Sequence, residues 1–279
     1  MAEYDPVYVA ARSVLLDALE ALGSQRDAII VVGAQAVYMQ TGDGDIALAP
    51  YTTDADLALT PDDLADDPLL EGLMRDAAFT LDAQQPGSWH KSVKVDGKDT
   101  DIPVDIMVPD GFAPPGGTRS VRIEPHDKMA ARKAVGLEGA VIDFDRMDIA
   151  ALDETDSRTF AVRVAGPAAL VIAKLHKIND RLRAGKRDRI ADKDASDVYR
   201  IMQAVPVDAF LARLRPLLED PISAGPTSAA IELLGELFGA PRVQGVQMAV
   251  ESLRTAVPAE RVEAICVAFT RQVREGLAS

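Results

Sequence analysis

The hydrophobic pattern of the chain changes character near residue 166. Before this point, β-branched runs such as the one from Ala28 to Val32 alternate with apolar residues at helical spacing. After Gly166-Pro167, helical spacing dominates and the β-branched runs disappear. The pattern therefore predicts an α/β domain over residues 1–165, with a mixed sheet flanked by helices, followed by an all-helical domain over residues 166–279.

Both regions are expected to contain a regular series of elements. Apolar spacing predicts helices over residues 6–22, 34–39, 69–77 and 126–134, and a short helix that begins at Pro61. Alternating or β-branched runs predict strands over residues 28–32, 56–59, 89–95, 102–108, 140–149 and 159–164. The turn at Asp96-Gly97 indicates that residues 89–95 and 102–108 form an antiparallel hairpin. In the second region, helices are predicted over residues 167–183, 192–203, 207–218, 227–238, 243–255 and 258–275.

The composition indicates a well-folded globular protein and excludes several kinds of site. The chain has 279 residues, of which 48% are hydrophobic. Its single cysteine, Cys266, rules out an internal disulfide and a multi-cysteine metal site, and its apolar neighbours favour a buried thiol. The three histidines, His90, His126 and His176, show no zinc-binding spacing. No apolar run is long enough to span a bilayer and the N-terminus lacks a secretory signal, so we expect a cytoplasmic protein without a membrane partner.

The charge balance limits the kinds of partner. A net charge of −14, from 44 acids and 30 bases, is not typical of a dedicated nucleic-acid scaffold. RNA contact would need a local basic patch, although the same residues could form a solvated helix face. The patch comprises Lys174, Lys177, Arg181, Arg183, Lys186, Arg187, Arg189 and Lys193. An acidic body also suits a cationic small substrate or a basic protein partner.

Two carboxylates stand one residue apart in the stretch from Tyr51 to Leu59. In an extended strand, Asp54 and Asp56 point to the same face, where they repel each other unless a divalent cation lies between them. A third carboxylate, Asp105, stands within the predicted strand 102–108. If these strands are neighbours, the three carboxylates form a metal site of the kind used for phosphoryl or nucleotidyl transfer.

Other interpretations of this stretch remain open. Thr52-Thr53-Asp54 before a strand is also ordinary turn chemistry. The pair Asp43 and Asp45 likewise precedes an apolar run. Spacing alone does not choose between the two pairs.

Two further polar features have both a functional and a structural interpretation. Gly33 follows the predicted strand 28–32 and precedes a helix, where free N–H groups can bind phosphate, although a plain tight turn needs the same glycine. Lys174 lies in an apolar helical segment, where a lysine often extends its amine toward solvent. Asp194 and Asp197 share a helix face, and with Lys174 they could form a structural ion pair. Asp192 or Asp194 could instead be a helix N-cap.

Taken in order, these motifs resemble the AbiEii-type nucleotidyltransferases, a family of bacterial toxins that includes the MenT toxins. The family belongs to the polymerase-β-like nucleotidyltransferase superfamily. The motifs are the strand that ends at Gly33-Ala34-Gln35-Ala36, Thr52-x-Asp54-x-Asp56, Asp105 in a strand, Lys174 in a helix, and Lys193-Asp194-x-x-Asp197-Val198-Tyr199. The resemblance covers about residues 28–201, and it implies a nucleotidyltransferase-like fold for the α/β domain.

The resemblance also implies a role for each motif. Asp54 and Asp56 would chelate Mg²⁺ or Mn²⁺, with Asp105 as the third carboxylate. Thr52 matches a hydroxyl residue that is common two positions before the pair, which favours Asp54 and Asp56 over Asp43 and Asp45. Lys174 would meet the triphosphate of an NTP, and Asp194 or Asp197 would be functional. Where the superfamily has Gly-Ser or Gly-Gly, this chain has Gly33-Ala34, so Gln35 or backbone N–H groups would hold the phosphate.

The implied function is transfer of a nucleoside monophosphate from an NTP to an acceptor hydroxyl. The implied acceptor is a tRNA acceptor end, with the chain acting as the toxin of a toxin–antitoxin pair and a cognate antitoxin as its partner. Two alternative functions remain open. One is a small-molecule transferase of the antibiotic-modifying type, and the other is a catalytically silent module that binds a nucleotide or a partner protein.

Overall fold

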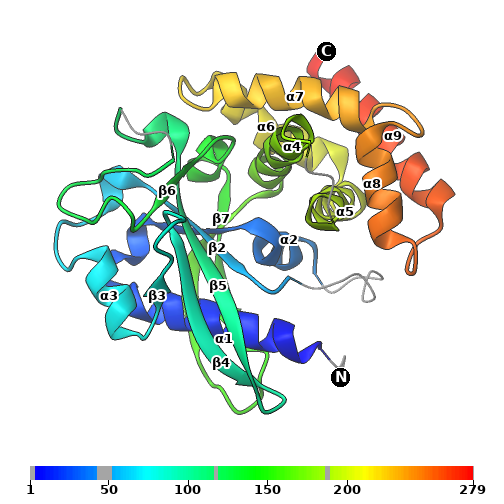
Figure 1. Cartoon of the computed structure of the whole chain (residues 1–279). Helices are drawn as coiled ribbons and strands as arrows, with labels where there is room; N and C mark the ends of the chain where they lie inside the picture. Colours follow the sequence, from blue (N-terminus) through cyan, green and yellow to red (C-terminus); the bar gives the residue numbers. More distant parts are fainter. Residues whose placement is uncertain (1–3, 43–51, 116–118, 186–188, 279) are drawn as a thin grey trace. The chain divides into compact units, whose positions relative to one another are not determined.

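A computed structural model describes residues 4–42, 52–115, 119–185 and 189–278 (Figure 1). The chain divides into two compact units. The first comprises residues 1–35, 51–134 and 144–164, and the second comprises residues 36–50, 135–143 and 165–279. The last change of unit falls beside the expected boundary at residue 165, and two earlier stretches group with the C-terminal helices.

The first unit is built on a mixed sheet. Its strands are β1 (Ile29–Val32), β2 (Ala55–Leu59), β3 (Thr80–Leu81), β4 (Ser88–Val95), β5 (Lys98–Pro109), β6 (Arg132–Ala134), β7 (Phe144–Ala150) and β8 (Thr159–Ala165). The strand order is β3-β4-β5-β2-β1-β8-β7, and β6 pairs with β5. The pairs β1–β8, β2–β5 and β5–β6 are parallel, whereas β1–β2, β3–β4 and β4–β5 are antiparallel. The expected mixed sheet and the hairpin of β4 and β5 are confirmed.

The helix α1 (Pro6–Ala21) packs against β2, β4 and β5 (Figure 1). Its start follows from local chemistry, because the Asp5 carboxylate accepts a hydrogen bond of 2.8 Å from the Val7 N–H and Pro6 occupies the first turn. Fully buried leucines, among them Leu15 and Leu19, form its core-facing stripe. The other helices that begin in this unit are α2 (Gly33–Thr41) and α3 (Leu70–Asp76).

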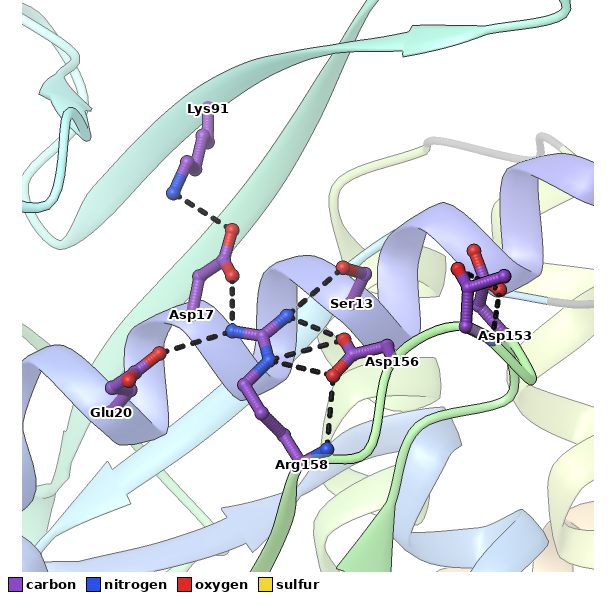
Figure 2. A network of polar contacts seen from close by, with 8 residues as sticks. Ser13, Asp17, Glu20, Lys91, Asp153, Asp156 and Arg158 are labelled. Atoms are coloured by element: carbon purple, nitrogen blue, oxygen red, sulfur yellow. Dashed lines mark hydrogen bonds and ion pairs between the residues drawn. The ribbon is translucent and has the colours of Figure 1, made fainter.

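A polar network joins α1 to the segment before β8 and to β4 (Figure 2). The Arg158 guanidinium donates to Asp17 at 2.6 Å, to Glu20 at 3.1 Å and to Asp156 at 2.7 Å. The second oxygen of Asp17 accepts from Lys91 at 2.7 Å. These bonds raise the pKa of Arg158, and the Arg158 guanidinium lowers the pKa of Asp156. The network fixes α1 over one face of the sheet, the face to which Lys91 points.

The second unit is mainly a helical assembly around an apolar core. Its helices are α4 (Pro167–Arg183), α5 (Arg189–Ala204), α6 (Val207–Glu219), α7 (Ala224–Phe238), α8 (Gln244–Leu253) and α9 (Ala259–Ala278). The rings of Phe210 and Phe269 meet edge to face with centroids 5.0 Å apart. Tyr199 and Phe238 are fully buried in the same unit. All six predicted helices of this region are confirmed, with ends that differ by a few residues.

The buried side chain of Asp143 explains why residues 135–143 belong to the second unit. One carboxylate oxygen accepts from the Ala169 N–H at 2.9 Å, in the first turn of α4. The other accepts from the Arg213 guanidinium at 2.7 Å. Burial raises the pKa of Asp143, although these two bonds oppose the increase.

Three sequence-based expectations need correction. The predicted helix over residues 126–134 is wrong, because its last residues form β6, whose ladder with β5 satisfies their backbone groups. The helix expected at Pro61 is only a 3₁₀ turn, Pro61–Asp63. The strand expected from residue 140 begins at Phe144, after a 3₁₀ turn. Within the described ranges, no helix combines the length and apolar character needed to cross a bilayer.

Candidate active site

One row of polar side chains crosses three neighbouring strands in the first unit. Asp56 of β2 is the register partner of Asp105 in the parallel strand β5, and Asp105 is the register partner of Ser88 in β4. Paired residues on neighbouring strands have their side chains on the same face of the sheet. The structure therefore places Asp56 and Asp105 side by side, as expected from their strand patterns.

Gly33 is required at its position because of Asp56. Gly33 begins α2 directly after β1, and its φ is +72°. A Cβ at this position would lie 2.0 Å from Asp56 Oδ2. The Asp56 carboxylate thus lies against the first turn of α2, where the helix dipole favours negative charge, and the residue is only 8% exposed. The sequence predicts that Gly33 lies against a ligand phosphate, whereas in the structure it lies against the Asp56 carboxylate.

Thr52 and Gln35 hold the segment that carries Asp54. The Thr52 hydroxyl donates to the Asp54 carboxylate, and the Gln35 amide donates to the Asp54 carbonyl at 3.1 Å. Gln35 also donates to the Ala11 carbonyl and accepts from the Arg12 guanidinium at 3.0 Å. Gln35 is 1% exposed and both polar atoms of its amide are engaged. In this arrangement it positions the Asp54 backbone rather than presenting its amide to a ligand.

Arg132 is a residue of this site that the sequence did not indicate. Its guanidinium donates to Asp105 Oδ2 at 2.8 Å, with side chains that are 20% and 28% exposed. The stem of Arg132 passes over Gly87, where an added Cβ would meet Arg132 atoms at about 3 Å. Arg132 reaches Asp105 only because β6 pairs with β5, and the segment had been predicted as a helix. No local pattern in the sequence signals this contact.

The donor set fits a magnesium ion in part. Across the described ranges, no three His, Cys, Asp or Glu side chains gather closely enough to hold a metal ion. The expected three-carboxylate cluster is therefore not assembled. Mg²⁺ commonly uses only one or two protein carboxylates and completes its shell with water and substrate phosphates. Asp56 and Asp105, which face the same side on neighbouring strands, fit that smaller site, and Mn²⁺ accepts the same oxygen ligands.

The second predicted constellation forms a buried ion cluster within the second unit. Lys174 Nζ lies 2.7 Å from Asp194 Oδ1 and 2.6 Å from Asp197 Oδ2, and the lysine side chain is 5% exposed. Burial alone would lower the pKa of Lys174, but the two carboxylates raise it well above its usual value. Burial likewise opposes ionisation of Asp194, yet Lys174 and Lys177 lower its pKa overall.

This cluster decides between the structural interpretations of Lys174. The amine does not extend toward solvent, and it forms the ion pair that the sequence left open. Asp194 and Asp197 do share a helix face. The N-cap interpretation of Asp192 or Asp194 is wrong, because α5 begins at Arg189. The alternative pair Asp43 and Asp45 lies outside the described residues, so its place in the fold is left open.

Comparison with models of known protein families gives no match, and no curated protein or solved structure is significantly similar to this chain.

Proposed function

We propose that this chain is a nucleotidyltransferase that depends on Mg²⁺ or Mn²⁺ and moves a nucleoside monophosphate from an NTP to an acceptor hydroxyl. The observation that carries the proposal is the register of β2 and β5, which sets Asp56 and Asp105 opposite each other on one face. Asp54 directly precedes the same strand, and its backbone is held by Gln35. The motif order along the sequence supports the same reaction.

The residues have distinct tasks in this reaction. Asp56 and Asp105 would hold the cation, and a bound cation would neutralise phosphate charge and polarise the α-phosphoryl group. The acceptor oxygen attacks the α-phosphorus, and the bond to the β-phosphate breaks. Pyrophosphate leaves with the electron pair of that bond. Gln35 and Thr52 contribute by fixing Asp54.

The proposed acceptor is a tRNA acceptor end, and the proposed biological role is that of the toxin in a toxin–antitoxin pair. Both rest on the resemblance of the ordered motifs and not on the geometry of the site. A cognate antitoxin would then be the protein partner. Co-expression with the product of a neighbouring gene would test this, since relief of growth arrest is expected only from the true antitoxin.

The central experiment incubates the protein with each α-labelled NTP, Mg²⁺ and total tRNA, and follows the label on a gel. Asp56→Asn and Asp105→Asn should each reduce transfer by at least about 10²-fold, because loss of a cation ligand removes several kcal/mol of transition-state stabilisation. Asp99→Asn is the matched control, because Asp99 also lies on β5 but is 74% exposed, and its ion pair with Lys94 lies at the surface. Full transfer by the Asp56 and Asp105 variants would contradict the proposal.

A catalytically silent nucleotide-binding module is the second candidate, and two observations favour it. Asp105 is already paired with Arg132, and the three carboxylates do not gather as a metal-holding group within the described residues. In such a module a fluorescent NTP would bind with unchanged affinity in the presence or absence of acceptor, and no label would reach tRNA or an aminoglycoside. Transfer to either acceptor would exclude it.

A further inference from the structure

A hydroxyl, an imidazole and a carboxylate stand in series on the hairpin of β4 and β5. Ser88 Oγ lies 3.4 Å from His90 Nε2, and His90 Nδ1 lies 3.3 Å from Asp101 Oδ2. An ionised carboxylate only accepts hydrogen bonds, so the tautomer that satisfies both contacts carries its proton on Nδ1. In that tautomer Nε2 is free to accept a proton from the Ser88 side.

The series lies on the same face of the sheet as the carboxylates of the candidate active site. Ser88 pairs with Asp105, which pairs with Asp56, so the three side chains form one row. His90 lies two residues further along β4 and therefore on the same face. Lys91 points to the opposite face, where it bonds Asp17 of α1 (Figure 2). The helix α1 therefore does not cover the face that holds His90.

His90 differs from the other two histidines in what its ring touches. His126 is 5% exposed, and its Nδ1 accepts from the Leu70 N–H at 3.2 Å. His176 Nε2 lies 2.9 Å from the Pro226 carbonyl, which has no proton to pass on. The His90 side chain is 30% exposed, and its two ring nitrogens face a hydroxyl and a carboxylate, which can exchange protons with an imidazole. His90 thus has the contacts of a general base.

Asp105, the register partner of Ser88, is less suited to the task of a general base. One of its oxygens accepts from Arg132, so that oxygen is engaged by a cation. A separate base is therefore useful to take the proton of the acceptor hydroxyl. Neighbouring strands are about 4.8 Å apart, which places Ser88 one strand from Asp105.

We propose that Ser88, His90 and Asp101 are the proton relay of the transfer reaction, with His90 as the base that takes the proton of the acceptor hydroxyl. This inference rests on the proposed function and assigns three more residues to the same face. Ser88 and His90 are catalytic residues in this scheme. Asp101 is a positioning residue, because it acts on the reaction through His90.

The relay moves one proton from the acceptor hydroxyl to His90 by way of Ser88. The acceptor oxygen forms its bond to the α-phosphorus while its proton passes to Ser88 Oγ, and the Ser88 proton passes to His90 Nε2. The α–β phosphoanhydride bond breaks, and its electron pair leaves with pyrophosphate. Ser88 is regenerated, and His90 becomes an imidazolium that the Asp101 carboxylate stabilises. His90 later returns its proton to solvent.

The same three residues do not form a serine hydrolase site. Such a site needs free backbone N–H groups to bind an oxyanion next to the nucleophile. The Gly87 N–H donates to the Met129 carbonyl at 2.8 Å, and the Ser88 N–H donates to the Gln85 carbonyl at 3.2 Å. With both donors engaged, Ser88 is better placed to pass on a proton than to form an acyl intermediate.

The charged groups near His90 come from β5 and from the segment after β3. Asp101 of β5 pairs with it, and Asp82, directly after β3, has its pKa lowered chiefly by the Gln84 and Gln85 N–H groups and in part by His90. Asp105 shares the face, but Arg132 offsets its charge. Asp101→Asn removes the carboxylate that faces His90 Nδ1, so it should slow transfer.

The test measures the single-turnover rate of transfer from an α-labelled NTP to total tRNA between about pH 5 and pH 9. His90→Gln should lower the rate by about 10²- to 10⁴-fold and remove the fall of the rate on the acid side. Asp101→Asn should give a smaller loss, and the conservative variant Asp101→Glu should retain part of the rate that Asp101→Asn loses. Ser92→Ala, an exposed neighbour on the same face of β4, is the control and should match the unaltered protein.

Two further measurements keep the outcome interpretable. Binding of a fluorescent NTP should be unchanged in His90→Gln, and added imidazole should restore part of the rate of His90→Ala. Full rates and an unchanged pH profile in His90→Gln would overturn the relay alone. An unaltered protein that transfers no label would overturn the proposed function together with the relay, so the two failures are distinguishable.

Discussion

Each unit of this protein sets two aspartates on one face, of the helix α5 in the second unit and of the sheet in the first, but the surroundings of the charges differ. In the second unit, Asp194 and Asp197 are buried, and Lys174 lies within 2.7 Å of both. In the first, Asp56 and Asp105 share a sheet face, and the Arg132 guanidinium donates to Asp105. Lys174, Asp194 and Asp197 are each 5% exposed or less, whereas Arg132 and Asp105 on the sheet face are 20% and 28% exposed. A cation from solvent can therefore reach the Asp105 carboxylate more easily than the buried carboxylates of the second unit.

The largest effect should come from breaking the buried cluster. Lys174→Met leaves two carboxylates buried without their amine, which typically costs about 3–5 kcal/mol of folding free energy. Urea denaturation followed by circular dichroism would measure the loss. Lys177→Met is the matched control, because that amine is 41% exposed and lies 3.4 Å from Asp194, so its change should stay within about 1 kcal/mol. Equal losses of folding free energy in the two variants would show that Lys174 does not offset the buried carboxylates more strongly than Lys177 does.

A smaller effect is expected where Asp56 lies against α2. Gly33→Ala forces a side chain into a φ of +72° and places its Cβ 2.0 Å from the Asp56 carboxylate. Gly97→Ala imposes a similar φ of +77° with nothing within 4 Å, so it measures the backbone strain alone, about 1–2 kcal/mol. Gly33→Ala should therefore be clearly the more destabilising variant in thermal unfolding, and it should also reduce transfer. Similar melting temperatures for the two would contradict the close contact.

The pH dependence of stability should separate the buried cluster from exposed acids. The pKa of Asp194 is lowered in the folded state, so its contribution to stability is present above the ordinary value of about 3.9 and is lost as pH falls through the lower folded value. The stability difference between the unaltered protein and Asp194→Asn should therefore shrink as the solution is acidified below about pH 4. Denaturation midpoints at several pH values would show this. A difference that is constant with pH would mean that Asp194 titrates as an ordinary acid.

The smallest effect on stability should come from Arg132→Gln. The Arg132–Asp105 pair is partly exposed, and such pairs contribute about 1 kcal/mol or less. The variant should instead bind Mg²⁺ or Mn²⁺ more tightly, because it frees an oxygen of Asp105. Calorimetric titration with Mn²⁺ would compare the two proteins. Unchanged affinity would indicate that Asp105 is not a ligand.

Most regular elements follow from local patterns, and the errors occur where a distant strand decides. The helix over residues 167–183 was predicted with its observed ends, because proline and glycine mark its start and its apolar spacing is continuous. Residues 132–134 form a strand because β5 offers partners for their backbone. The residues of the candidate active site also differ in whether local patterns predict them. The strand patterns indicated Asp56 and Asp105, but no short-range signal indicated Arg132, or the approach of Ser88 to their row.

The sequence by itself determined the two-part organisation, the extended segment after Asp54, and the face that Asp194 shares with Asp197, because all of these depend on periodicity and on neighbouring residues. Only the tertiary structure decided what each charge faces. Asp105 meets an arginine, Lys174 is enclosed by two carboxylates, and Gly33 lies against Asp56. The physical reason is that burial and long-range pairing set the environment of a charged group, and neither is encoded in the spacing between residues along the chain.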